Sequence, residues 1–188
     1  LWMVLTAPYM SLIAATALLF LENGTATRAG TAIGLLVLKP SLLAGPLALL
    51  LWLRRWPELK RALAVAFVLG LVPFFFIGIE AVFDYRQVLS NLSRDGFRLE
   101  GTVTIGADNL LNWNGYWVKL LDRDVILPLV VPFYIATLAL TLRIWRVGSL
   151  REAWLAQTAA GLLDLPHVLA YERLLLLPAA AAVAIERP

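Results

Sequence analysis

The chain has 188 residues, of which 61% are hydrophobic and 15% are charged, with a mean hydropathy of +0.79. Soluble domains carry about 45–50% apolar and about 25% charged residues, so this composition excludes disorder, nearly excludes a soluble enzyme and predicts a multi-pass membrane protein. The absence of cysteine, the single histidine and the net charge of +3 argue against disulfides, Cys-ligated or multi-His metal sites and a nucleic-acid surface.

The first two apolar stretches differ in how they cross the bilayer. Residues 1–21 are nearly uncharged and long enough to span about 30 Å of hydrocarbon. Residues 29–53 are interrupted by Lys39-Pro40. Because proline breaks a helix interior, this stretch is either one kinked span or a hairpin of half-length helices over 27–38 and 42–53. Basic residues flank it on both sides, and the positive-inside rule then favours the hairpin with Lys39 near its tip.

The middle of the chain predicts a span followed by a polar region. Residues 59–79 form the span, and residues 80–92 have the pattern of an amphipathic helix on the bilayer surface. Residues 93–124 are the one long polar stretch and predict an ordered extracytoplasmic loop.

The last third predicts another span over 125–142, a short apolar helix over 154–163 and a final apolar stretch over 174–185. Arginines between the first two mark a cytoplasmic loop. We interpret residues 1–188 as one transmembrane domain, the C-terminal part of a longer protein, with 80–124 as its extracytoplasmic segment.

Three groups of residues are candidates for chemistry. Lys39 is an ammonium at a helix break near hydrocarbon, which either binds an anion such as a lipid phosphate or reaches the interface or a carboxylate. His167, Tyr171 and Glu172 form a polar cluster that would orient a substrate, or a solvated interfacial loop. Asn112, Trp113 and Asn114 combine aromatic faces with amides, as sugar-binding surfaces do, although interface anchoring explains the tryptophan equally well.

Gly30 and Gly34 have the GxxxG spacing that lets another helix approach closely. Together with the segments GLLVLKP at 34–40 and LLWLRRW at 50–56, they resemble glycosyltransferase family 87. The segments at 84–85, 109–115 and 165–178 also resemble segments of this family, and they follow one another in the same order along the chain. Tyr171-Glu172 departs from the Tyr-Asp that is common in the family, and Pro8-Tyr9 stands where members often have Gly-Gln.

The resemblance implies an all-α bundle of the GT-C type in the plasma membrane, with a short helix hairpin and a long extracytoplasmic loop. It implies transfer of a sugar, with mannose as the expected one, from polyprenyl phosphate to a lipid or glycan hydroxyl outside the cytoplasm. No cofactor is expected, no residue here is a candidate metal ligand, and metal dependence stays open. Lys39 would bind the donor phosphate. The family's catalytic Asp is expected upstream, so this chain by itself would be inactive. The alternatives are a secondary transporter with a broken-helix site and a non-catalytic lipid-binding subunit.

Overall fold

The structure, a computed structural model, describes residues 2–78, 80, 113, 126–164 and 174–186. Every regular element in these ranges is helical, which confirms the all-α expectation for the part described. In chain order the elements are α1 (Trp2–Glu22), α2 (Ala26–Leu35), the 3-10 helix η1 (Leu36–Leu38), α3 (Pro40–Trp52), α4 (Trp56–Ile77), α7 (Ile126–Val147), α8 (Leu150–Asp164) and α9 (Leu176–Glu186).

Several helices extend beyond the predicted apolar spans. Helix α4 begins at Trp56 instead of residue 59, α7 continues to Val147 instead of residue 142, and α8 begins at Leu150 instead of residue 154. The added turns carry charged side chains, so a prediction from hydropathy excludes these turns from the helix. Charged side chains are nevertheless favourable at helix ends. Arg146, for example, lies in the last turn of α7, where a cation is favourable. The predicted surface helix 80–92 and loop 93–124 lie outside the described residues, apart from Glu80 and Trp113.

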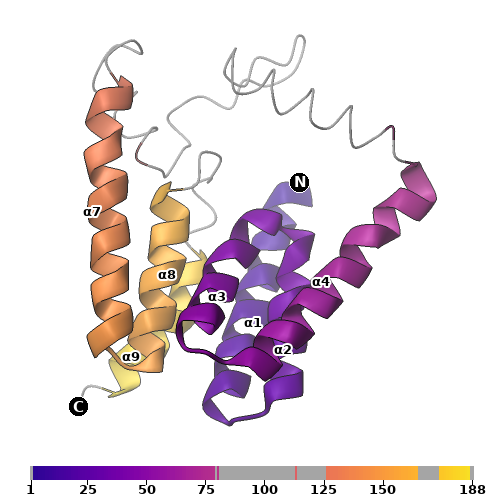
Figure 1. The fold of residues 1–188 in the computed structure, drawn as a ribbon, viewed down its shortest axis with the longest axis horizontal. Coiled ribbons are helices and arrows are strands. Elements are labelled where there is room, and N and C mark those ends of the chain that lie inside the picture. The colour runs from indigo at the N-terminus through magenta and orange to yellow at the C-terminus, as the bar shows by residue number, and fades with distance from the viewer. Residues whose placement is uncertain (1, 79, 81–112, 114–125, 165–173, 187–188) are drawn as a thin grey trace.

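The segment between α1 and α4 is a hairpin and not one kinked span. Thr25 Oγ1, just before α2, donates to Phe20 O at 3.2 Å, and Arg55, just after α3, donates from Nη1 to Leu21 O at 2.9 Å. Both ends of the segment therefore meet the C-terminal end of α1. Lys39 joins η1 to α3, so it lies at the opposite end, at the tip of the hairpin. Figure 1 shows α1 to α4 gathered in one bundle.

Side-chain size is distributed as expected for a helix bundle in lipid. Nine of the 21 buried hydrophobic residues in the described part of the chain are alanines, while many large apolar side chains are exposed. Phe75 and Phe76 on α4 are each 84% exposed, and Ile135 on α7 is 62% exposed. Small residues inside let helices approach closely where lipid removes the usual hydrophobic driving force.

At the GxxxG pair, α2 and α4 approach each other closely. A Cβ on Gly30 would lie 2.6 Å from Glu58 O, and a Cβ on Gly34 would lie 2.6 Å from Val65 Cβ. Position 30 thus faces the start of α4 and position 34 faces its next turn, so α2 and α4 run in parallel. The prediction that these glycines admit another helix is confirmed.

One stretch in the described residues, Val130–Val147, is by itself long and apolar enough to cross a membrane. Ala7–Glu22, Ala26–Leu38, Pro40–Trp52 and Leu176–Ile185 are shorter apolar helices. The half-length hairpin arms belong to this second group, since α2 has 10 residues and α3 has 13.

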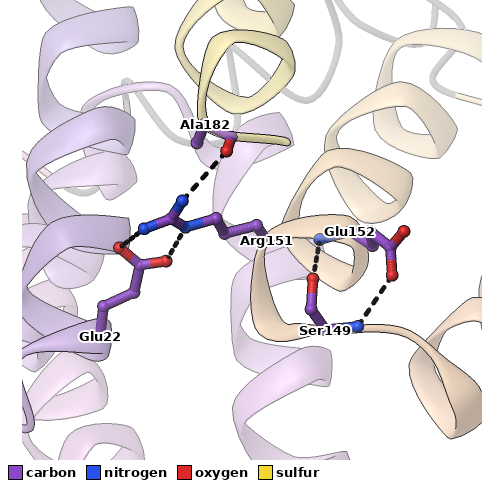
Figure 2. A network of polar contacts seen from close by, with 5 residues as sticks. All are labelled: Glu22, Ser149, Arg151, Glu152 and Ala182. Atoms are coloured by element: carbon purple, nitrogen blue, oxygen red, sulfur yellow. Dashed lines mark hydrogen bonds and ion pairs between the residues drawn. The ribbon is translucent and has the colours of Figure 1, made fainter. Parts of the chain in front are cut away.

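A polar network connects α1, α8 and α9 at the end of the bundle away from Lys39 (Figure 2). Arg151 binds the Glu22 carboxylate through two nitrogens, Nη2 being 3.1 Å from Oε2, and its Nη1 donates to Ala182 O at 3.1 Å. Beside it, Ser149 N–H donates to Glu152 Oε2 at 2.9 Å and Glu152 N–H to Ser149 Oγ at 3.3 Å. This reciprocal pair is a capping box that begins α8.

Candidate functional site

Lys39 lies where the backbone changes course between two helices. Its φ of −134° and ψ of 85° end η1 and begin α3, and Pro40 occupies the first helical position. Lys39 N–H donates to Leu36 O at 2.9 Å, and its carbonyl accepts from Leu42 N–H at 2.8 Å. The side chain is half-buried. The fold thus places this ammonium in a defined turn, as the hairpin interpretation predicts.

The basic residues are divided unequally between the two ends. Of the nine lysines and arginines in the described ranges, eight lie within about a turn and a half of helix ends opposite Lys39. We call this the arginine end: Arg28, Arg54, Arg55, Lys60, Arg61, Arg143, Arg146 and Arg151. Lys39 is the exception. The other end is therefore the Lys39 end, and among the described basic side chains Lys39 alone supplies positive charge there.

The ends of α8 and α9 pack beside the Lys39 turn. Leu36 in η1 forms one buried cluster with Met10, Leu162 and Leu175. Ser11 Oγ also donates to Leu174 O at 2.9 Å, which ties α1 to the start of the α9 segment. The residues that precede and follow 165–173 are thus close to the lysine turn. His167, Tyr171 and Glu172 themselves lie outside the described residues.

A small cavity of about 30 Å³ lies next to the lysine turn, between α3 and α8. That volume suffices for about one or two waters. Its polar lining consists of Ser41, Gln157 and Thr158. Gln157 is only 6% exposed, and its Nε2 donates to Thr158 Oγ1 at 3.2 Å. Gln157 and Thr158 were not singled out from the sequence, although they are the polar pair within an otherwise apolar helical segment.

Trp113 is held against α7. Its Nε1 donates to Thr137 Oγ1 at 3.0 Å, and its ring lies 4.9 Å from the ring of Phe133, measured between centroids. The indole thus has its one donor engaged and its ring in tilted contact with a second ring, which fixes Trp113 against the helix. Trp113 therefore has a packing role in addition to any contact with a sugar. Asn112 and Asn114 lie outside the described residues.

The described residues contain no group of three or more His, Cys, Asp or Glu side chains placed to hold a metal ion. The described residues at and near the Lys39 end include a half-buried ammonium, a buried amide and hydroxyl groups. Groups of these kinds are the ones that proteins use to bind anions and sugars and to stabilise developing negative charge.

The described residues form a helical bundle with an alanine-rich interior and many exposed large apolar side chains, an arrangement that is typical of helical membrane proteins. Residues 7–178 match glycosyltransferase family 87, and the chain belongs to this family. The resemblance drawn from the sequence is therefore confirmed. No curated protein and no solved structure matches the chain.

Proposed function

We propose that the protein is a multi-pass plasma-membrane glycosyltransferase that uses a polyprenyl-phosphate sugar, with mannose as the sugar. The acceptor in this proposal is a lipid or glycan hydroxyl outside the cytoplasm. Family membership gives the glycosyltransferase class. The observation that supports the donor is the position of Lys39, a half-buried ammonium in the hairpin turn at the end away from the other described basic residues.

The exterior of the bundle supports placement across a bilayer. Helix α7 contains Val130–Val147, an apolar stretch of 18 residues that is about 27 Å long at 1.5 Å per residue. That length is close to a hydrocarbon core of about 30 Å. Helices α4 and α7 both present large apolar side chains outward, among them Phe67, Phe76 and Leu138.

The charge asymmetry supports an orientation. Lysine and arginine collect on cytoplasmic loops, so the arginine end would face the cytoplasm. The Lys39 end would then face outward. In that position the donor phosphate would enter from the lipid head-group level, with its prenyl tail in the bilayer.

The proposed reaction is a displacement at the anomeric carbon of the donor sugar. The acceptor oxygen forms a bond to that carbon, and the bond from carbon to phosphate oxygen breaks. The electron pair leaves with polyprenyl phosphate, and the acceptor proton passes to a base. Lys39 would stabilise the negative charge that develops on the leaving phosphate, which is an electrostatic contribution and not proton transfer.

The remaining candidates keep supporting roles in this proposal. His167, Tyr171 and Glu172 would orient the sugar or the acceptor, and Asn112, Trp113 and Asn114 would contact the acceptor or sugar. The location of the neighbouring helix ends beside Leu36 is compatible with the first group acting near Lys39.

The test is a sugar-transfer assay on membranes that contain the full-length protein, with polyprenyl-phosphate mannose as donor. Wild type is compared with Lys39→Ala and Lys39→Arg. Loss of one electrostatic stabiliser of a transition state costs about 10²–10³-fold in kcat. We expect a loss of that order for Lys39→Ala and partial retention for Lys39→Arg.

Lys60→Ala is the matched control, because Lys60 is exposed at the arginine end. It should leave transfer unchanged. Transfer that survives Lys39→Ala, with equal amounts of protein in the membrane, would remove the phosphate role. Absence of transfer from every prenyl-linked sugar would instead favour a non-catalytic lipid-binding subunit or a transporter.

A further inference from the structure

The turn between α3 and α4 contains a strained arginine. Arg54 has φ +55° and is the one non-glycine residue with positive φ in the described chain. Arg54 N–H donates to Leu51 O at 3.1 Å, and Arg55 N–H donates to Leu50 O at 2.9 Å. These two bonds make a Schellman motif, in which glycine normally occupies the position of Arg54.

The end of α1 provides the comparison within the same molecule. Gly24 N–H donates to Leu21 O and Thr25 N–H to Phe20 O, so Gly24 occupies the equivalent position, with φ +68°. The chain thus uses glycine at one helix end and arginine at the other. Residues held in such strained backbone conformations cluster at functional sites, where the surrounding structure maintains them.

The side chain of Arg54 lines a groove of about 540 Å³ at the arginine end. The other lining residues are Ala48, Leu51, Trp52 and Trp145. This volume falls within the range of about 300–1,000 Å³ for small-molecule sites. The lining is apolar and aromatic, with one cation and no acidic residue.

A second arginine, outside the lining residues, contacts one of the two tryptophans that line the groove. The Arg146 guanidinium carbon is 5.7 Å from the centroid of the Trp52 ring, and the centroids of the Trp52 and Trp145 rings are 6.1 Å apart. Trp145 is fixed in turn, because its Nε1 donates to Ala153 O at 3.2 Å. Trp52 remains 40% exposed and both arginine side chains are exposed, so the site is open to a ligand.

We propose that this groove binds the head group of an anionic phospholipid. The phosphate would lie with Arg54 and Arg146, the glycerol region against the two tryptophans, and the acyl chains along Ala48 and Leu51. Basic side chains near the membrane surface attract anionic lipids, and tryptophans sit at the head-group level. The site differs from the Lys39 site and lies at the other end of the bundle. It rests on the proposed membrane placement and not on the sugar donor.

The test is native mass spectrometry of the full-length protein, titrated with phosphatidylglycerol and with phosphatidylcholine. Wild type should bind phosphatidylglycerol about tenfold or more tightly, as expected for two basic groups at a surface. Arg54→Gly/Arg146→Ala should bring the two lipids to near-equal binding. Arg28→Ala/Lys60→Ala removes two exposed charges from the same end outside the groove and should keep the preference.

Further variants and a competition experiment test the proposal from other directions. Arg54→Gly alone relieves the positive φ, so it should lower lipid preference without lowering the melting temperature, which separates lost binding from lost folding. Excess inorganic phosphate should fail to displace the lipid, and full displacement would indicate a free-anion site instead. An equal loss in both double variants, or no preference in wild type, would overturn the lipid site. Lys39→Ala should keep the preference, which separates this test from the sugar-transfer assay.

Discussion

Arg151 of α8 holds the Glu22 carboxylate of α1 with two nitrogens and the carbonyl of Ala182 in α9 with a third. The two charged side chains are 26% and 21% exposed. One side chain therefore joins three helices that are distant in sequence. We expect Arg151→Ala to destabilise the bundle by about 1–3 kcal/mol, because it leaves a partly buried carboxylate and a carbonyl without this donor.

Glu22→Gln should cost less than Arg151→Ala, because an amide oxygen still accepts one bond and Ala182 O keeps its partner. The measurement is the melting temperature of the purified protein in detergent. Arg143→Ala is the control, since Arg143 is exposed on α7. Equal melting temperatures for Arg151→Ala and Arg143→Ala would show that the network contributes nothing.

The contact between α2 and α4 makes the second prediction. A Cβ at Gly34 would come within 2.8 Å of Ala62 O as well as 2.6 Å of Val65 Cβ, so even alanine would force the helices apart. Overpacking of this kind costs about 1–3 kcal/mol. We expect Gly30→Ala and Gly34→Ala each to lower the melting temperature.

Gly70 on α4 provides the control, because a Cβ there would meet nothing within 4 Å. Gly70→Ala should be neutral or stabilising by up to about 1 kcal/mol, since alanine favours the helix. Equal changes in melting temperature for Gly34→Ala and Gly70→Ala would show that close packing at Gly34 contributes nothing.

The sequence predicted the helices well where apolar runs were long and the breaks were prolines. Lys39-Pro40 correctly indicated a break, and the flanking charges correctly favoured the hairpin. Helix ends were predicted less well, because hydropathy leaves out charged terminal turns such as the one at Arg146. The capping box at Ser149 and Glu152 could have located the start of α8 from sequence.

The candidate site was only partly accessible from the sequence. Lys39 was found because a cation in an apolar stretch is conspicuous. Gln157 was missed because its importance depends on packing against Gly45, 112 positions earlier in the chain, which no local pattern shows. Arg54 was likewise not singled out, because its significance depends on its positive φ. The basic residues in the sequence of this turn do not reveal that angle.

Gly45 and Gln157 make the third prediction. A Cβ at position 45 would overlap Gln157 Oε1, so Gly45→Ala must displace a buried amide. We expect a loss of about 1–2 kcal/mol for Gly45→Ala in wild type. In a Gln157→Ala background the same change should cost much less, because the obstructing atoms are gone.

A double-mutant cycle on melting temperature measures this coupling. Residues in contact give interaction energies of about 0.5–3 kcal/mol, whereas independent sites add. Additive effects at positions 45 and 157 would show that the two residues do not contact each other in the protein.

The last prediction compares the two Schellman turns. Arg54 pays a backbone cost that Gly24 avoids, so Arg54→Gly should raise stability, and Gly24→Ala should lower it, each by about 1 kcal/mol. A Cβ at Gly24 would meet nothing within 4 Å, so any loss there comes from the positive φ alone. Melting temperatures measured in detergent without anionic lipid isolate this backbone term.

Added phosphatidylglycerol should then stabilise wild type more than Arg54→Gly, because a ligand stabilises the folded state that binds it. If Arg54→Gly melts lower than wild type without lipid, Arg54 is in that turn for stability, and the argument from strain to lipid binding fails.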